Sequence, residues 1–251
     1  MRDGVSHAPR TLRVCALYPD LMNIYADRGN LLMLERRCSW RGIGFELIAS
    51  TLGDALDPDA GDLFYIGGGQ DRDQRLCAED LIETKREALH AAAARGAVVL
   101  GVCGGYQLLG RSYTLDDERI EGVGLLDVET VREGARLIGN VAIEVRLDAS
   151  DGPRVLAGFE NHGGRTRLGE AQRPLGRVLK GFGNDGRTSW EGAIAGNTIG
   201  TYLHGPLLPK NSWFADWLIA RSLGLGPGTL AALDDELEGE AHLSASHAAG
   251  L

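Results

Sequence analysis

The first half of the chain alternates between short apolar runs and longer stretches in which apolar and polar residues mix. Four apolar runs predict strands, over residues 12–18, 44–50, 62–70 and 98–102. The last run, Val-Val-Leu-Gly-Val, is typical of a buried strand in a parallel sheet. Helices are predicted over residues 25–41 and 79–95, and again directly after residue 103. This alternation predicts an α/β fold, a doubly wound and mostly parallel sheet with flanking helices.

The second half has shorter apolar runs separated by Gly, Asp and Pro, which is typical of antiparallel strands. Strands are predicted over residues 124–131, 140–147, 154–160 and 198–206, before a helix that begins near Asn211. We expect these strands to form a β-rich extension folded onto the same core. The predicted organisation is a flexible leader over residues 1–11, one domain over residues 12–223, and an acidic, poorly ordered tail with some helix over residues 224–251.

A cysteine at the end of the most apolar run is the strongest candidate for chemistry. Cys103 lies between Gly101 and Gly105, so the local pattern is G-x-C-x-G. In a sharp strand-to-helix turn the neighbours of a nucleophile are crowded and must lack side chains. The N-terminus of the following helix should favour the thiolate over the thiol. The pattern therefore predicts a catalytic Cys103 rather than a buried structural cysteine.

The amino-acid composition excludes some classes of function and indicates the cellular compartment. The 251 residues are 43% hydrophobic and 24% charged, which is ordinary for a globular enzyme. A net charge of −9 argues against nucleic acid or an anionic membrane as a general partner. No apolar run reaches transmembrane length, and the four cysteines lack paired spacing, so we expect a reducing, cytoplasmic location. The six histidines are scattered, so no metal site is expected.

A nucleophilic cysteine also needs a general base and groups that stabilise an oxyanion. Two histidines, His162 and His204, lie outside the chain ends and the predicted helices, and His204, at a strand end before Gly-Pro, is the better base. Residues 67–69 form a Gly-Gly-Gly loop at the end of a predicted strand, where the backbone can approach a ligand. We expect the oxyanion to be bound by backbone N–H groups of that loop, at Gly68 and Gly69, and of Gly104.

Three motifs together resemble the class I (triad-type) glutamine amidotransferases, and the resemblance covers most of residues 12–223. They are the glycine loop, Gly-Val-Cys-Gly-Gly-Tyr-Gln at residues 101–107 and Tyr-Leu-His-Gly at residues 202–205. The resemblance implies a glutaminase in which the cysteine attacks the carboxamide of L-glutamine, ammonia leaves, and water releases glutamate from a thioester. It also implies that Gln107 helps to hold the substrate.

The sequence departs from the usual family pattern directly after the histidine. Pro206 replaces the glutamate that normally orients the base, which resembles the cobyric-acid-synthase-like branch. Two possibilities stay open for the third catalytic group. Glu160, close to His162 in the sequence, is a candidate orienter of the base, and a Cys–His dyad is the alternative.

Four segments resemble one subfamily of that branch, the glutaminase subunits of lipid II isoglutaminyl synthases: residues 18–30, 67–71, 158–166 and 183–192. The resemblance implies a heterodimer with a MurT-like Mur ligase subunit that amidates the D-glutamate α-carboxylate of lipid II during peptidoglycan synthesis. It also implies an arginine that binds the substrate glutamine. Arg136 is the best positional match, with a solvated surface arginine as the alternative. Because the chain has no Walker-type P-loop, we expect no cofactor here, and ATP and Mg²⁺ in the partner.

Other functions stay open on the sequence alone. One is the glutaminase of another amidotransferase, and another is a γ-glutamyl-type cysteine hydrolase on the same fold. Gln107, and the absence of a carboxylate next to the nucleophile, favour the amidotransferase. A non-enzymatic regulatory subunit that binds a metabolite is a further possibility, which an inert Cys103 with an ordinary thiol pKa would support.

Overall fold

A parallel sheet lies at the centre of the computed structural model, which describes residues 10–24, 27–115, 118–148 and 152–251. Its six strands have the order β11-β12-β4-β3-β1-β2. Five of these strands run parallel: β1 (Thr11–Leu17), β2 (Gly44–Ser50), β3 (Leu63–Ile66), β4 (Val98–Val102) and β12 (Thr198–Thr201). The edge strand β11 (Ala193–Ala195) is antiparallel to β12. The predicted doubly wound, mostly parallel sheet is confirmed.

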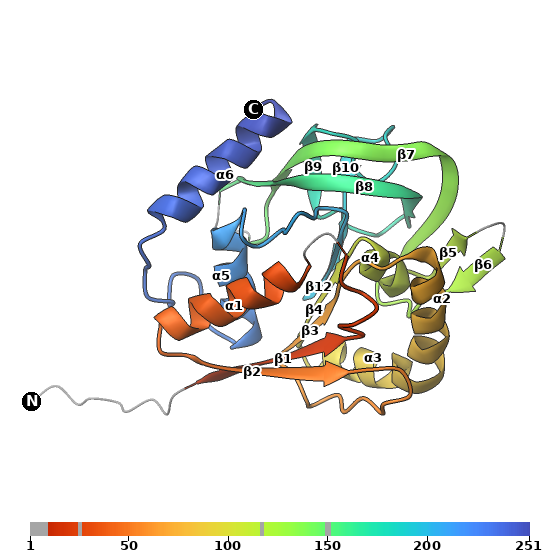
Figure 1. Ribbon diagram of the computed structural model, residues 1–251, viewed down its shortest axis with the longest axis horizontal. Coiled ribbons are helices and arrows are strands. Elements are labelled where there is room, and N and C mark those ends of the chain that lie inside the picture. The colour runs from red at the N-terminus through yellow and green to blue at the C-terminus, as the bar shows by residue number, and fades with distance from the viewer. Residues whose placement is uncertain (1–9, 25–26, 116–117, 149–151) are drawn as a thin grey trace, which may run out of the picture.

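Helices cover both faces of this sheet, which is why its central strands need continuous apolar runs. Every residue of β3 and β4 is buried. One face carries α1 (Arg28–Trp40) and α5 (Ser212–Ser222), and the other carries α2 (Asp71–Asp80), the π-helical η1 (Leu81–Lys85) and α3 (Arg86–Ala94) (Figure 1). The crossover from β1 to β2 and the crossover from β3 to β4 run in opposite directions along the sheet. The carboxyl ends of β1, β3 and β4 therefore meet at a topological switch point, where ligands bind in such sheets.

The helix predicted over residues 79–95 begins earlier than its apolar pattern indicates. The helical segment starts at Asp71, and Asp71 and Asp73 lie in its first turn, where negative charge is favourable. This first stretch is polar, so it has no apolar period that would reveal a helix. Cys77, which the sequence places just before the helix, lies inside α2 and is buried.

The second half forms a second six-stranded sheet, built mainly from antiparallel pairs. Its strands are β5 (Ser112–Leu115), β6 (Glu118–Glu121), β7 (Val128–Val145), β8 (Arg154–Leu168), β9 (Gly176–Lys180) and β10 (Trp190–Glu191). The two strands predicted over residues 124–131 and 140–147 are one long strand, β7, with an irregularity between Arg132 and Leu137. The polar, glycine-containing residues at that irregularity interrupt the apolar alternation. Figure 1 shows the long β7–β8 pair beside the first sheet.

The second half of residues 224–251, expected to be a poorly ordered tail with some helix, contains a long helix. Residues Glu236–Ala249 form α6, which packs beside β7 and β8 (Figure 1). The buried guanidinium of Arg37 bonds Asp235 at 2.6 Å and Asp216 at 2.5 Å, and so fixes the start of this helix to α1 and α5. At its other end, Asn140 donates to the Ala248 carbonyl at 2.9 Å. These anchors are polar and distant in sequence, so no apolar period predicts them.

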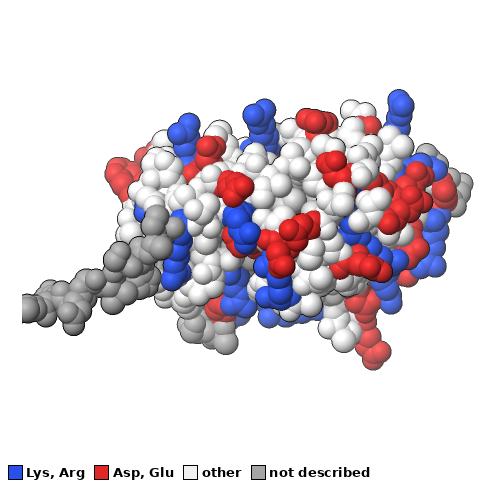
Figure 2. All heavy atoms as spheres, turned by 90° about the horizontal axis from the view of Figure 1, so that it is seen from below, with Lys and Arg blue, Asp and Glu red and all other residues white. Residues whose placement is uncertain are grey.

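The surface mixes charges of both signs. On the face shown in Figure 2, Lys and Arg side chains are interspersed with Asp and Glu side chains. Among the described residues, no helix is long and apolar enough to cross a membrane.

Candidate active site

Cys103 stands at the sharp turn between β4 and α4 (Gly104–Leu109). Its backbone has a φ of 53°, an unusual conformation for a residue other than glycine and one that is common at functional turns. The flanking glycines are required sterically, because a Cβ at Gly105 would lie 2.2 Å from the Ile66 carbonyl oxygen. A Cβ at Gly101 would lie 2.7 Å from the backbone of Gly105. The predicted reason for the paired glycines, crowding around the turn, is confirmed.

Two opposing effects determine the pKa of the Cys103 thiol. The Gly104 N–H donates to the sulfur and lowers the thiol pKa, as expected at a helix N-terminus. Burial outweighs this effect, and the buried carboxylate of Asp27 adds to it, so the pKa of Cys103 is raised to about 12. The N-terminus of the six-residue helix α4 thus acts in the expected direction, but loss of water around the sulfur has the larger effect on the thiol pKa.

His204 lies at the same edge, three residues after the end of β12, the strand next to β4, and forms an isolated β-bridge with Phe159. β12 runs in register with β4, pairing Thr201 with Val102, and the Cys103 N–H donates to the Thr201 carbonyl at 2.8 Å. The imidazole of His204 is fully buried. Burial, with smaller effects from His162 and Arg136, lowers its pKa to about 4. At neutral pH His204 is therefore neutral, the form that can accept a proton from a thiol.

The glycine loop lies against the turn, but not every amide in it faces Cys103. A Cβ at Gly68 would lie 3.5 Å from the Cys103 Cβ, and a Cβ at Gly104 would lie 3.1 Å from the Gly69 nitrogen. The Gly68 N–H, however, donates to Asp27 Oδ2 at 2.6 Å. Gly68 was expected to be an oxyanion donor, but its N–H group already donates to Asp27 and is not available. Gly69 and Gly104 are the donors that the geometry favours.

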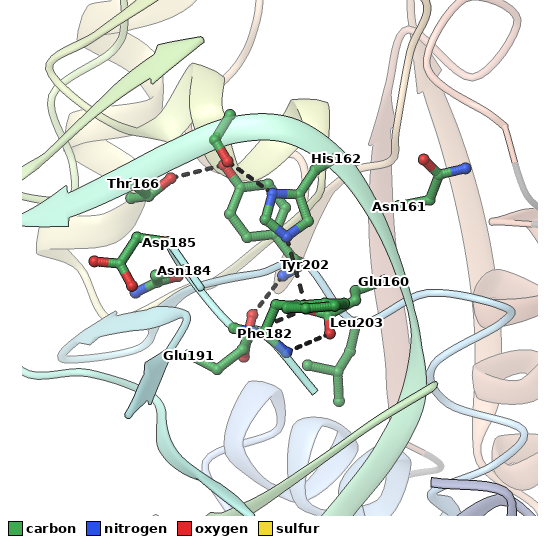
Figure 3. Close-up of polar contacts among 12 residues, drawn as sticks. Glu160, Asn161, His162, Thr166, Phe182, Asn184, Asp185, Glu191, Tyr202 and Leu203 are labelled. Atoms are coloured by element: carbon green, nitrogen blue, oxygen red, sulfur yellow. Dashed lines mark hydrogen bonds and ion pairs between the residues drawn. The ribbon is translucent and has the colours of Figure 1, made fainter. Parts of the chain in front are cut away.

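Glu160, the candidate orienter, lies beside the other histidine. Its carboxylate accepts the N–H groups of Phe182 at 2.6 Å and Gly183 at 2.9 Å. One of its oxygens is 3.7 Å from His162 Nε2. Figure 3 shows the His162 ring lying flat on Tyr202, with centroids 3.6 Å apart, and Glu160 below them. The contact that the structure gives Glu160 is therefore with His162, so its role toward His204 stays a prediction.

Gln107 is held rigidly next to the nucleophile. Its carbonyl oxygen accepts Gln74 Nε2 at 2.7 Å, and its amide nitrogen donates to the Tyr202 hydroxyl at 3.1 Å. The Tyr202 hydroxyl is in turn bonded to Thr166 Oγ1 at 2.7 Å. One amide hydrogen of Gln107 is not used in this chain of contacts. Sequence reasoning missed Gln74, which lies in the polar start of α2, where no motif marks it.

A small cavity opens above Cys103 and is lined by Gln107, His162, Gly163 and two arginines of β7, Arg132 and Arg136. Arg136 lies in the irregular part of β7, where Asn161 fixes its guanidinium through Oδ1 at 2.8 Å and the carbonyl at 2.9 Å. Its charge lowers the pKa of both Cys103 and His204. Arg136 is exposed to solvent and also lines this cavity, where it can bind an anionic group, so its role in binding the substrate stays a prediction.

This arrangement can perform acyl transfer. It combines a buried thiol, a neutral histidine shortly after the end of the adjoining strand, two amides beside the sulfur and a cation that lines a small cavity. These are the groups that nucleophilic attack on a carbonyl requires. The arrangement matches the chemistry expected from the G-x-C-x-G motif.

Comparison with known proteins gives a consistent answer. Residues 13–212 match the family model of the CobB/CobQ-like glutamine amidotransferase domain. The chain is 40% identical over 204 residues to the lipid II isoglutaminyl synthase (glutamine-hydrolyzing) subunit GatD of Staphylococcus aureus, covering 81% of each protein. It is 37% identical over 224 residues to the subunit of the same name from Streptococcus pneumoniae, covering 88% of this chain and 84% of that protein.

More distant relatives fit the same pattern. The cobyric acid synthase of Pelotomaculum thermopropionicum is 40% identical over 163 residues, which are 57% of this chain and 30% of that enzyme. Among solved structures, PurLQS from Thermotoga maritima has a TM-score of 0.57 at 18% identity, covering 94% of this chain and 99% of that one. A glutamine amidotransferase of the same organism has a TM-score of 0.51 at 16% identity, covering 97% and 95%. At these identities the two structures support the fold alone.

Proposed function

The chain belongs to the CobB/CobQ-like glutamine amidotransferase family and is a glutamine-hydrolysing amidotransferase, and on that premise we propose that it is the glutaminase subunit of a lipid II isoglutaminyl synthase. The observation that carries the chemistry is that Cys103 directly follows β4 and a neutral His204 follows the end of the neighbouring parallel strand β12, so that both lie at the same edge of the sheet. The acceptor is supported by the similarity to two GatD subunits over 81% and 88% of this chain.

The first half-reaction begins from a neutral pair. Cys103 is a thiol and His204 a free base, so His204 takes the thiol proton as the sulfur attacks the carboxamide carbon of L-glutamine. The N–H groups of Gly69 and Gly104 stabilise the oxyanion that forms. His204 then gives the proton to the leaving nitrogen, ammonia departs, and a γ-glutamyl thioester remains on Cys103.

The second half-reaction reverses the roles. His204 accepts a proton from a water molecule, whose oxygen attacks the thioester carbon, and the same two amides hold the second oxyanion. The carbon–sulfur bond breaks, the thiol of Cys103 is restored, and glutamate leaves. The sum is glutamine plus water giving glutamate plus ammonia.

Two side chains hold the substrate in this proposal. Arg136, fixed by Asn161 at the mouth of the cavity, binds the α-carboxylate of glutamine. Gln107 uses its remaining amide hydrogen as a donor to the substrate, because its other polar contacts are already made within the protein. A rigid donor of this kind positions the substrate without an entropic cost of its own.

The ammonia is used by a partner subunit. Because the sequence has no P-loop, ATP and Mg²⁺ belong to a Mur-ligase-like partner of the MurT type. That partner activates the D-glutamate α-carboxylate of lipid II, and ammonia from this chain converts it to isoglutamine. The reaction takes place in the cytoplasm, where ATP is available.

Co-expression with a Mur-ligase-like subunit tests the proposal. Glutamate release and lipid II amidation are measured together for the parent, Cys103→Ala and His204→Ala. We expect both variants to lose amidation from glutamine and to regain it when ammonium salt is added. Unchanged glutamine-dependent amidation in Cys103→Ala would refute the mechanism. Glutamate release without amidation of lipid II would keep the glutaminase and refute this acceptor.

A further inference from the structure

One buried carboxylate beside the nucleophile has no part in the mechanism above. Asp27 is fully buried and occupies the N-cap position of α1, yet its side chain makes no cap hydrogen bond to that helix. It reaches instead to the glycine loop, where Oδ2 accepts the Gly68 N–H at 2.6 Å. Its other oxygen, Oδ1, has no hydrogen-bond partner among the described residues. A buried carboxylate is costly, so its contact with the loop calls for an explanation.

The two peptide units of the glycine loop are each held at a defined point. In the first, between Gly67 and Gly68, the carbonyl accepts the Gly105 N–H at 3.0 Å and the N–H donates to Asp27. In the second, between Gly68 and Gly69, the carbonyl accepts the Ile24 N–H at 3.2 Å. A trans peptide directs its N–H opposite to its carbonyl, so the Gly69 N–H faces away from Ile24, toward Gly104.

We propose that Asp27 is a positioning residue for glutamine hydrolysis, which fixes the glycine loop so that the Gly69 N–H is aimed at the oxyanion. Three successive glycines have wide conformational freedom, and the loop cannot hold one orientation by sterics alone. The hydrogen bond to Asp27 anchors the side of the loop that faces away from the nucleophile. A donor that is aimed before the reaction is worth more than one that must be reoriented during it.

The same turn of α1 also contacts the loop that carries the general base. Asn30 is buried, and its Oδ1 accepts the Leu208 N–H at 2.8 Å, four residues after His204. Its Nδ2 donates to the Tyr65 hydroxyl at 2.9 Å, and that hydroxyl lies 3.4 Å from the Asp27 carbonyl. The first turn of α1 thus ties the glycine loop to the histidine loop, and Asp27 is its contact with the former.

The inference rests on the proposed glutaminase and is tested with the full chain. Glutamate release is measured over a range of glutamine concentrations for the parent, Asp27→Ala and Asp27→Asn. The matched control is Asp20→Ala, which removes an exposed carboxylate from the same β1–α1 connection. In parallel, each protein is treated with iodoacetamide, and alkylation of Cys103 is followed by mass spectrometry. Alkylation requires a reactive sulfur but forms no oxyanion. Its rate therefore measures the reactivity of Cys103 independently of the oxyanion donors in the glycine loop.

We expect kcat of Asp27→Ala to fall by about 10- to 100-fold, with KM changed less than about threefold, because an oxyanion donor acts only in the transition state. Cys103 of this variant should be alkylated at least as fast as in the parent, since a neighbouring negative charge is gone. Asp27→Asn keeps an oxygen that can accept the Gly68 N–H, and should retain kcat within about threefold of the parent. Asp20→Ala should match the parent throughout.

Three results would overturn the inference. One is an Asp27→Ala variant with the kcat of the parent. The second is an Asp27→Asn variant as impaired as Asp27→Ala, which would assign the effect to charge. The third is a parallel loss of hydrolysis and alkylation, which would indicate general damage to the site. A parent that releases no glutamate while its Cys103 is readily alkylated would instead refute the proposed function.

Discussion

Replacing Gly105 by alanine perturbs the turn that presents the nucleophile without removing any catalytic group. The new Cβ would lie 2.2 Å from the Ile66 carbonyl oxygen and 2.8 Å from the carbonyl carbon, so it meets the backbone of β3. A side chain could rotate away, but a strand at the centre of the sheet cannot, and α4 has to shift by roughly 1 Å.

The expected cost follows from two separate effects. Overpacking of this kind lowers the free energy of unfolding by about 1–3 kcal/mol, which corresponds to a fall in Tm of roughly 2–12 °C for a protein of this size. A displacement of about 1 Å at reacting groups reduces kcat by about 100-fold. The loss of activity should therefore far exceed any loss of folded protein at assay temperature.

The assay pairs denaturant unfolding with steady-state glutamate release at a temperature where the variant is folded. Gly239→Ala is the matched control, because its Cβ would meet nothing within 4 Å and the residue lies inside α6. The same chemical change should there raise stability by about 0.5–1 kcal/mol and leave kcat unaltered. A Gly105→Ala protein with the stability and kcat of the parent would refute the steric account of the turn.

Three further variants test other parts of the structure. Arg136→Ala should raise KM for glutamine by at least about tenfold with little change in kcat. The control Arg167→Ala, on the neighbouring strand, should alter neither constant. An unchanged KM of Arg136→Ala in steady-state assays would show that Arg136 does not bind the substrate. Burial raises the pKa of Asp27 from 3.8 to about 7, so the folded state loses stability relative to the unfolded state as the pH rises through that range. Asp27→Asn should accordingly have a free energy of unfolding up to about 4 kcal/mol above that of the parent at pH 8, and the same value as the parent at pH 4. Urea unfolding at the two pH values measures this, and the same difference between variant and parent at both pH values would contradict it. Arg37→Ala removes the buried partner of Asp235 and one of the two arginines that pair with Asp216, and should cost about 3–5 kcal/mol of unfolding free energy. Arg36→Ala, on the exposed face of α1, should cost less than about 0.5 kcal/mol in the same measurement.

The features that sequence analysis predicted correctly are local in the chain. The apolar run of β4 and the glycines at positions 101 and 105 are determined by burial and by sterics within a few residues, and both are readable in the sequence. Gly104 directly follows the nucleophile in the chain, and the loop with Gly69 was expected to approach a ligand because three glycines follow a predicted strand.

The features that were missed depend on burial or on polar contacts between distant residues. The protonation state of Cys103 depends on how completely the fold excludes water, which no local motif reports. The bond from Gly68 to Asp27 joins residues 41 positions apart, so no local pattern in the sequence predicts it. The start of α6 is anchored by Arg37, which belongs to a helix almost 200 residues earlier.

The central claim is that Cys103 carries the acyl group of glutamine during hydrolysis. The most direct measurement is acid quenching of the full chain at saturating L-glutamine, followed by mass spectrometry of the cysteine-containing peptides. The account predicts a γ-glutamyl adduct on Cys103, none on the buried Cys15, Cys38 and Cys77, and no glutamate release by Cys103→Ala. An adduct on another cysteine, or glutamate release by Cys103→Ala at the rate of the parent, would contradict it.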